Sequence, residues 1–248
     1  MPYATVVYTR KDHIACITLN RPEVKNIVNQ LLAQELEDVC RHVNQDDDVY
    51  VVIVTGAGDK AFCSGTEARQ VSPGYSPSTA IAGIDRPVIA AINGDALGQG
   101  LELALSCDIR LASRQARFGF PQVGKGIIPM DGGTQRLPRI VGKGKALELI
   151  LTSEIISAGE ALEIGLVNKV VTRENLAPEV DTLAKTIAAK GPLALRYAKE
   201  AVNKGMDLTL DQGLRLEADL YSLLHTTADR TEGINAFLQK RPPKFKGK

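Results

Sequence analysis

The sequence predicts an α/β protein in which strand–strand–helix units repeat to about residue 175 and a helical region follows. Three observations lead to this fold class. Nearly continuous apolar runs at residues 49–56 and 87–92 are typical of strands inside a parallel sheet. Segments with apolar residues at helical spacing lie between the strand-like runs. From residue 178 to the end the chain reads as successive helices.

The N-terminal part contains a hairpin, a helix and the first buried strand. Two β-rich runs within residues 4–19 flank a turn-prone segment and predict the hairpin. Apolar residues then recur at helical spacing from about residue 29 to 44. The buried strand that follows ends in a glycine-rich turn over residues 56–65. Residues 68–79, rich in Ser, Pro and Gly, are expected to form a flexible loop.

Short elements follow the strand at residues 87–92. Two short strands are expected at 108–112 and 116–118, and a loop-rich segment at 119–133. We divide the chain into a core, residues 1–175, and a C-terminal helical region, residues 176–248, that packs on the core or on a neighbouring subunit. A strand is expected at 167–171 and helices over residues 135–151, 157–165, 176–189, 193–204, 208–227 and 230–239.

Composition excludes several classes of function. The formal net charge is +1 with both signs mixed, and aromatic residues make up 4%, which disfavours binding to nucleic acid or to an anionic membrane. No apolar run approaches the roughly 20 residues of a membrane span, and the N-terminus has no signal-peptide pattern. We therefore expect a cytoplasmic protein. The cysteines form no CxxC pair, so we expect core thiols rather than a metal site or disulfides: Cys16, Cys40, Cys63 and Cys107.

The segment after the strand at residues 87–92 carries the strongest chemical signal. Three glycines lie between positions 94 and 100, and an apolar helical pattern starts directly after them. A strand, a glycine-rich turn and a helix start place free backbone N–H groups and a positive dipole end at one point, which suits a developing oxyanion. Glu102 lies about one turn inside this helix. The alternative is a close helix–strand contact in which Glu102 is only a surface residue.

A series of motifs along the chain resembles the crotonase (enoyl-CoA hydratase/isomerase) superfamily. No single motif is specific, but their order over nearly the whole length is. The resemblance implies a ββα-repeat spiral core, a C-terminal helical region that forms homotrimers or hexamers, and an acyl-CoA thioester substrate. The motifs are ITLNRP (17–22), VIVTG (52–56), AFCSG (61–65), PVIAAING (87–94), LGQGLE (97–102), CDIR (107–110), FGFP (118–121), GGTQRL (132–137) and EALEIGLV (160–167).

The resemblance also implies an oxyanion hole made of two backbone N–H groups. By position these belong to Thr66, directly after Gly65, and to Gln99. Relatives usually have glycine where Gln99 stands. Because the donor is the backbone, the glutamine side chain need not abolish the oxyanion hole, although it can reshape it. Losing one such donor typically costs about 3–4 kcal/mol in the transition state.

Hydratases of this family use two glutamates, and here only one is present. Glu102 matches the first, but the second position is Gln122. A neutral amide can orient water but cannot usefully accept or release a proton. Three interpretations follow: Glu102 does all the proton transfer while Gln122 orients water or substrate, Asp131 supplies the missing carboxylate, or the reaction is not hydration. Asp131 can also be only a turn residue before two glycines, and Gln122 can reflect a loss of function.

Two further regions bear on substrate binding. The segment at residues 66–86 is shorter than in most relatives, and because it lines the acyl pocket its length should change acyl specificity. In relatives the C-terminal region helps close over the CoA of the same or a neighbouring subunit. An exposed lysine or a basic tail is by default only solvated. The residues that the resemblance assigns to CoA binding are Val24, Lys25, Asn26, Gly65, Phe237 and Lys240.

The function that the sequence predicts is an acyl-CoA lyase that adds water to an enoyl- or dienoyl-CoA in fatty acid metabolism, with Glu102 as acid and base. Coenzyme A is part of the substrate, and no other cofactor and no metal is expected. A CoA-dependent isomerase or decarboxylase of the same superfamily is one alternative. A non-catalytic acyl-CoA binding homologue is another.

Overall fold

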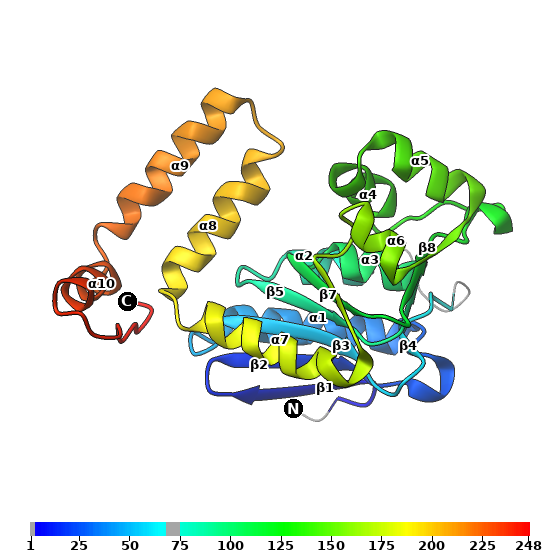
Figure 1. The fold of residues 1–248 in the computed structure, drawn as a ribbon, viewed down its shortest axis with the longest axis horizontal. Coiled ribbons are helices and arrows are strands. Elements are labelled where there is room, and N and C mark those ends of the chain that lie inside the picture. Colours follow the sequence, from blue (N-terminus) through cyan, green and yellow to red (C-terminus); the bar gives the residue numbers. More distant parts are fainter. Residues whose placement is uncertain (1–2, 68–74) are drawn as a thin grey trace.

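A six-stranded sheet forms the centre of the computed structural model, which describes residues 3–67 and 75–248 (Figure 1). The first two strands pair antiparallel, as the hairpin prediction required, and all other pairs in this sheet are parallel. Its order is β1 (Val6–Lys11), β2 (Ile14–Leu19), β3 (Val51–Gly56), β5 (Val88–Ile92), β7 (Ile109–Ser113) and β10 (Lys169–Val171).

A second, four-stranded sheet was not predicted. Its strands have three residues each, which is too short for an alternating pattern to show in the sequence. They are β4 (Ala61–Cys63), β6 (Asp95–Leu97), β8 (Arg117–Gly119) and β9 (Ile155–Ser157). β4, β6 and β8 each follow a strand of the large sheet and precede a helix, so the repeating unit is strand, strand, helix. This arrangement confirms the ββα-repeat core.

Helices cover both faces of the large sheet. The side chains of β3 alternate, so that Val52 and Val54 pack into a core with α1, whereas Val51 packs against α7 on the other face. Burial on both faces explains the continuous apolar run of this strand. The helices are α1 (Gln30–Gln45), α2 (Pro77–Ala82), α3 (Gln99–Leu105), α4 (Gly133–Val141), α5 (Lys143–Thr152), α6 (Ala158–Glu163), α7 (Arg173–Ala188), α8 (Pro192–Gly205), α9 (Leu210–Leu224) and α10 (Ala228–Leu238). Short 3₁₀ helices occupy Pro22–Val24 and Val123–Lys125.

Two of the sequence-based expectations are wrong in detail. The helix expected over residues 135–151 is two helices, because Gly142 adopts a left-handed φ of 80° that interrupts α4 and α5. The loop expected over residues 68–79 gives way to α2 at Pro77, a residue well suited to a first helical turn. Residues 68–74 of that loop lie outside the described part of the chain.

The C-terminal helices divide into one that belongs to the core and three that extend from it. α7 buries Leu176, Val180 and Ala184 against the sheet, so the expected division at residue 175 falls within this helix. α8, α9 and α10 project away from the sheet (Figure 1). In α9 only Leu220 is buried. None of the helices in the described residues is long and apolar enough to cross a membrane.

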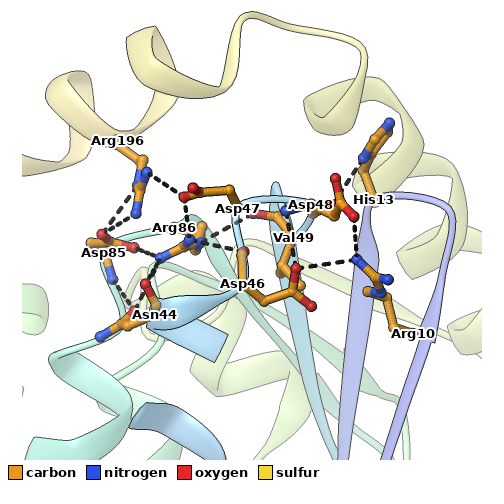
Figure 2. A network of polar contacts seen from close by, with 10 residues as sticks. All are labelled: Arg10, His13, Asn44, Asp46, Asp47, Asp48, Val49, Asp85, Arg86 and Arg196. Atoms are coloured by element: carbon orange, nitrogen blue, oxygen red, sulfur yellow. Dashed lines mark hydrogen bonds and ion pairs between the residues drawn. The ribbon is translucent and has the colours of Figure 1, made fainter. Parts of the chain in front are cut away.

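Arg86 anchors the turn between α2 and β5 (Figure 2). Its side chain is only 2% exposed. The guanidinium donates to the carbonyl oxygens of Val49 at 3.1 Å, Asn44 at 3.1 Å and Asp46 at 2.9 Å, and it pairs with the carboxylate of Asp85. The planar group thereby ties together the end of α1, the start of β3 and the segment before β5.

α8 docks on the same turn through its own cations. Arg196 pairs with Asp85 at 2.6 Å, as Figure 2 shows, and Lys199 pairs with Asp108 at 2.7 Å. Lys199 also donates to the carbonyl oxygen of Arg86 at 2.9 Å. The position of the helical extension therefore depends on the Arg86 turn.

Replacing Arg86 with methionine should lower the free energy of unfolding by about 3 kcal/mol, because the carbonyl groups of Val49, Asn44 and Asp46 each lose a donor and Asp85 loses one cation and keeps Arg196. Urea unfolding followed by circular dichroism measures this change. The matched control is Arg41→Met, since Arg41 forms an exposed ion pair with Asp38; its loss should amount to less than about 1 kcal/mol. Similar values for both variants would contradict the anchoring role of Arg86.

Candidate active site

The first turn of α3 packs directly on the backbone that follows β4. A Cβ atom at Gly100 would lie 1.8 Å from the carbonyl oxygen of Cys63, so only glycine fits at this point. Cys63 itself is fully buried, and burial raises the pKa of its thiol to about 12, which confirms a packed rather than a reactive cysteine. The contact brings the N-terminus of α3 beside the turn that contains Thr66.

Neither predicted oxyanion donor has a hydrogen-bond partner within residues 3–67 and 75–248. The turn is held by the carbonyl oxygen of Val28, which accepts from the hydroxyl of Thr66 at 3.1 Å and from the N–H of Glu67 at 2.8 Å. The N–H of Thr66 has no acceptor among the described residues. Neither does the N–H of Gln99, which is the first residue of α3 and so lacks a partner within the helix. Two free donors at one point can bind a developing oxyanion.

Glu102 is buried and held by the start of α4. One carboxylate oxygen, Oε1, accepts hydrogen bonds from the backbone N–H groups of Asp131 at 2.7 Å and Gly133 at 2.9 Å. The side chain is 1% exposed, and burial raises the pKa of its carboxyl. These two N–H groups lower that pKa in part, and the negative charge of Asp131 raises it again. A carboxyl with a raised pKa suits a group that both accepts and returns a proton.

Gln122 lies beside Gly98, the residue that precedes α3. A Cβ atom at Gly98 would be 3.3 Å from its Nε2, and the carbonyl oxygen of Gly98 accepts the N–H of Glu102. The Oε1 atom of Gln122 is buried and has no hydrogen-bond partner within the described residues. A buried acceptor without a partner is rare in folded proteins and calls for a bound water or ligand. The structure therefore places an available acceptor beside Gly98, at the start of α3.

Asp131 is buried in the site rather than exposed in a turn. Its carboxylate accepts from the hydroxyl of Ser76, from the N–H of Ser78 at 2.8 Å and from the side-chain amide of Gln99. These donors come from the start of α2 and the start of α3. The carboxylate thus already has several partners, and a role for Asp131 in proton transfer stays a prediction.

The N-terminal residues assigned to CoA lie beside the oxyanion turn. The carbonyl oxygen of Lys25 accepts the N–H of Ser64 at 3.1 Å, and that of Gly65 accepts the N–H of Val28 at 2.9 Å. Asn26 is fully buried, and its side chain is committed to the backbone of neighbouring loops, donating to the carbonyl oxygens of Ala57 and Ala61 at 2.9 Å. The segment around Lys25 and Asn26 therefore lies next to the Thr66 turn, and the role of Val24, Lys25, Asn26 and Gly65 in CoA binding stays a prediction.

The C-terminal residues assigned to CoA are not brought to this site within one chain. Phe237 is 83% exposed near the end of α10, and Lys240 follows it. α10 lies at the opposite side of the molecule from α3 and α4 (Figure 1). If these two residues contact CoA, they do so in an assembly.

Some partners in the site were not identified from the sequence. The N–H groups that hold Glu102 and the hydroxyl of Ser78, which accepts from Gln99 at 3.1 Å, were not predicted. The Gly132–Gly133 pair before a helix was the one available signal for backbone donors. Residues 3–67 and 75–248 contain no cluster of His, Cys, Asp or Glu suited to a metal.

Comparison with known proteins shows relatives of this chain in both sequence and fold. A family model described as enoyl-CoA hydratase/isomerase matches residues 9–248. The crotonyl-CoA hydratase of Syntrophomonas wolfei subsp. wolfei is 44% identical over 99% of both chains. The short-chain-enoyl-CoA hydratase of Clostridium acetobutylicum is 40% identical over 97% of both. A crystal structure of enoyl-CoA hydratase from Bacillus anthracis superimposes with a TM-score of 0.95 at 40% identity, covering 99% of this chain and 100% of that one.

Replacing Gly100 with alanine should lower turnover of a CoA thioester by about 100-fold or more. The added Cβ cannot coexist with the carbonyl of Cys63, so α3 must shift and its N–H group leaves the oxyanion hole. Steady-state kinetics measures the loss, with circular dichroism to verify folding. Gly144→Ala is the matched control, because this helical glycine has open space around it, and it should retain activity. Full activity of Gly100→Ala would contradict the assigned geometry.

Proposed function

Because the chain belongs to the enoyl-CoA hydratase/isomerase family, we propose that it is a lyase that adds water to the double bond of a 2-enoyl-CoA. The observation that carries this proposal is the arrangement around α3. A buried carboxylate with a raised pKa, Glu102, lies one turn from the unpaired N–H group of Gln99, and α3 packs on the turn that holds the N–H of Thr66. Addition of water to an unsaturated thioester needs both an oxyanion site and an acid–base group.

In the proposed reaction the oxygen of water bonds to the β carbon of the acyl group, and a proton is added at the α carbon. The thioester oxygen carries negative charge in between, and the N–H groups of Thr66 and Gln99 stabilise it. Glu102 accepts the proton of the water and returns a proton to the α carbon. Gln122 offers its unpaired Oε1 to the water and orients it. One carboxylate then does the proton transfer that relatives divide between two.

The proposed substrate is a short-chain enoyl-CoA. Two relatives of nearly full-length similarity are named crotonyl-CoA hydratase and short-chain-enoyl-CoA hydratase. The CoA part is proposed to pass along residues 24–26, because this segment is bonded to the backbone next to Thr66. The reaction needs no cofactor beyond the CoA of the substrate.

Gln122 also supports a second candidate function. Where relatives have a second glutamate for hydration, this chain has a neutral amide. An isomerase that moves a double bond, or a decarboxylase, needs the oxyanion hole but no activated water. The two candidates differ in the mass of the product, because hydration adds one water to the substrate and isomerisation adds nothing.

Incubation with crotonyl-CoA should yield a product heavier by one water, detected by mass spectrometry. Glu102→Gln should lower kcat by at least about 100-fold, because acid–base catalysis is lost. A raised pKa means that the protonated carboxyl stabilises the fold at acid pH and that this stabilisation is lost as the pH rises through the folded-state pKa. Neutral glutamine should therefore not lower the thermal stability at neutral pH.

The control variant is Glu148→Gln, since this residue lies on the exposed side of α5, and its activity should match the wild type. Full activity of Glu102→Gln would overturn the assignment of Glu102. A product of unchanged mass from a 3-enoyl-CoA, without hydration of any 2-enoyl-CoA, would favour the isomerase. Binding of CoA esters with no turnover on a panel of substrates would favour a non-catalytic homologue.

We also propose that the chain assembles as a homotrimer or as a dimer of trimers. The protruding helices carry large apolar side chains that a single chain leaves exposed, and in α9 Leu210, Leu214 and Tyr221 fall on one stripe. Covering this stripe requires another chain. Assembly would also supply the contacts through which Phe237 and Lys240 could reach a CoA site.

Light scattering should give three or six times the chain mass of 26.7 kDa. Leu214→Glu should reduce that mass, because a charge in an apolar interface is costly to bury. Asp219→Lys is the control, since residue 219 lies opposite the stripe on α9, and it should preserve the assembly. A wild-type protein that is monomeric at micromolar concentration would contradict the proposal.

A further inference from the structure

The side chain of Gln99 is held in a defined position. It is buried, and its amide nitrogen donates to the hydroxyl of Ser78 at 3.1 Å and to the carboxylate of Asp131. Related enzymes usually have glycine at this position, which has no side chain to hold. In this chain, the residue that supplies the predicted oxyanion N–H therefore has an additional attachment to the rest of the site.

Asp131 contacts both the proposed acid–base group, Glu102, and Gln99, which supplies a predicted oxyanion N–H. Its backbone N–H donates to Glu102 at 2.7 Å, while its carboxylate accepts from Gln99. The carboxylate also accepts from Ser76 and Ser78 at the start of α2. One residue thus connects the acid–base group, the oxyanion donor and a third helix.

The chemistry of these contacts requires a carboxylate. All the groups that Asp131 contacts through its side chain are donors: two N–H groups and a hydroxyl. Arg136 donates to the carbonyl oxygen of Asp131 at 3.0 Å and not to its carboxylate. An asparagine would point an NH₂ group at one of these donors, leaving it unpaired in a buried place.

We propose that Asp131 is a positioning residue that acts through Gln99: its carboxylate holds the Gln99 side chain and so fixes the N–H that binds the thioester oxygen, while its own N–H orients Glu102. This rests on the proposed function, because it concerns the oxyanion N–H of Gln99. Asp131 needs no contact with the substrate in this role. It also explains how a larger residue is accommodated where relatives have glycine.

The test compares Asp131→Asn in two backgrounds, wild type and Gln99→Gly. In the wild type, Asp131→Asn should lower kcat about tenfold or more with a smaller change in KM. In the Gln99→Gly background, where the side chain that Asp131 holds is absent, the same substitution should have a clearly smaller effect. Equal effects in both backgrounds, or an effect confined to KM or to thermal stability, would overturn the proposal.

Two controls separate positioning from a purely structural role. Ser76→Ala removes a partner of Asp131 in α2 but leaves Gln99 in place, so kcat should change less than about threefold. Should Asp131→Asn not fold, Gln99→Leu tests the proposal instead, because it keeps the volume but loses the amide. It should lower kcat in the way expected for Asp131→Asn, and unchanged turnover would count against the proposal.

The pH profile gives an independent readout. The charged groups that face Glu102 are Asp131, which raises the pKa of its carboxyl, and Arg136 of α4, which lowers it. Asp131→Asn should therefore shift the acidic limb of kcat to lower pH. Gln99→Gly and Ser76→Ala keep both charges and should leave the limb in place. A limb that does not move in Asp131→Asn would contradict the electrostatic effect of the Asp131 carboxylate on Glu102.

A binding measurement distinguishes failure of this inference from failure of the proposed function. A cinnamoyl-CoA thioester absorbs at longer wavelength when donors polarise its carbonyl group. The wild type should produce this shift whether or not it hydrates the compound, and Asp131→Asn should reduce it. If the wild type polarises the thioester without hydrating any enoyl-CoA, hydration fails as the proposed function and the positioning role stands. An equal shift in wild type and Asp131→Asn would overturn the positioning role alone.

Discussion

The site depends on one close contact, that between Gly100 at the start of α3 and the backbone at Cys63. Because no Cβ separates them, the helix start meets the turn after β4 and the unpaired N–H groups of Thr66 and Gln99 belong to one site. The two-sheet core produces this contact. β4 and β6 are neighbours in the small sheet, so the segments that follow them, the Thr66 turn and α3, begin side by side.

The second constraint is the burial of Glu102. A carboxylate removed from water is unfavourable unless donors compensate, and the N–H groups at the start of α4 do so only in part. The part of the desolvation that these donors do not compensate keeps the pKa of the Glu102 carboxyl raised. The chain therefore gives up stability at the residue on which proton transfer is proposed to depend, a pattern common at catalytic positions.

Two departures from the family pattern, Gln99 and Gln122, lie close to Asp131. Gln122 leaves an acceptor free beside Gly98, whereas Gln99 and Asp131 satisfy one another and occupy positions on either side of Glu102. The carboxylate of Asp131 therefore does not simply replace the carboxylate that is absent at Gln122. The Asp131 carboxylate faces α2 and Gln99, so what it contributes is the position of other groups.

Much of this protein could be predicted from its sequence. The long strands, such as β3, and the longer helices follow from apolar periodicity, and the order of motifs predicts Glu102, Thr66 and Gln99 as site residues. Such patterns are local, so each segment carries its own signal. The break at Gly142 and the start of α2 at Pro77 were not predicted, because single residues decide them and no periodic pattern marks them.

Only the tertiary structure decided the rest. The three-residue strands of the small sheet have no periodicity of their own and exist because the large sheet places them side by side. The role of Asp131 was open from sequence, between a turn residue and a catalytic acid. Its contacts with Glu102 and with the starts of α2 and α3 join positions that are 29 to 55 residues apart. Hydrogen bonds over such separations are set by how the elements pack, and no local pattern of residues encodes them.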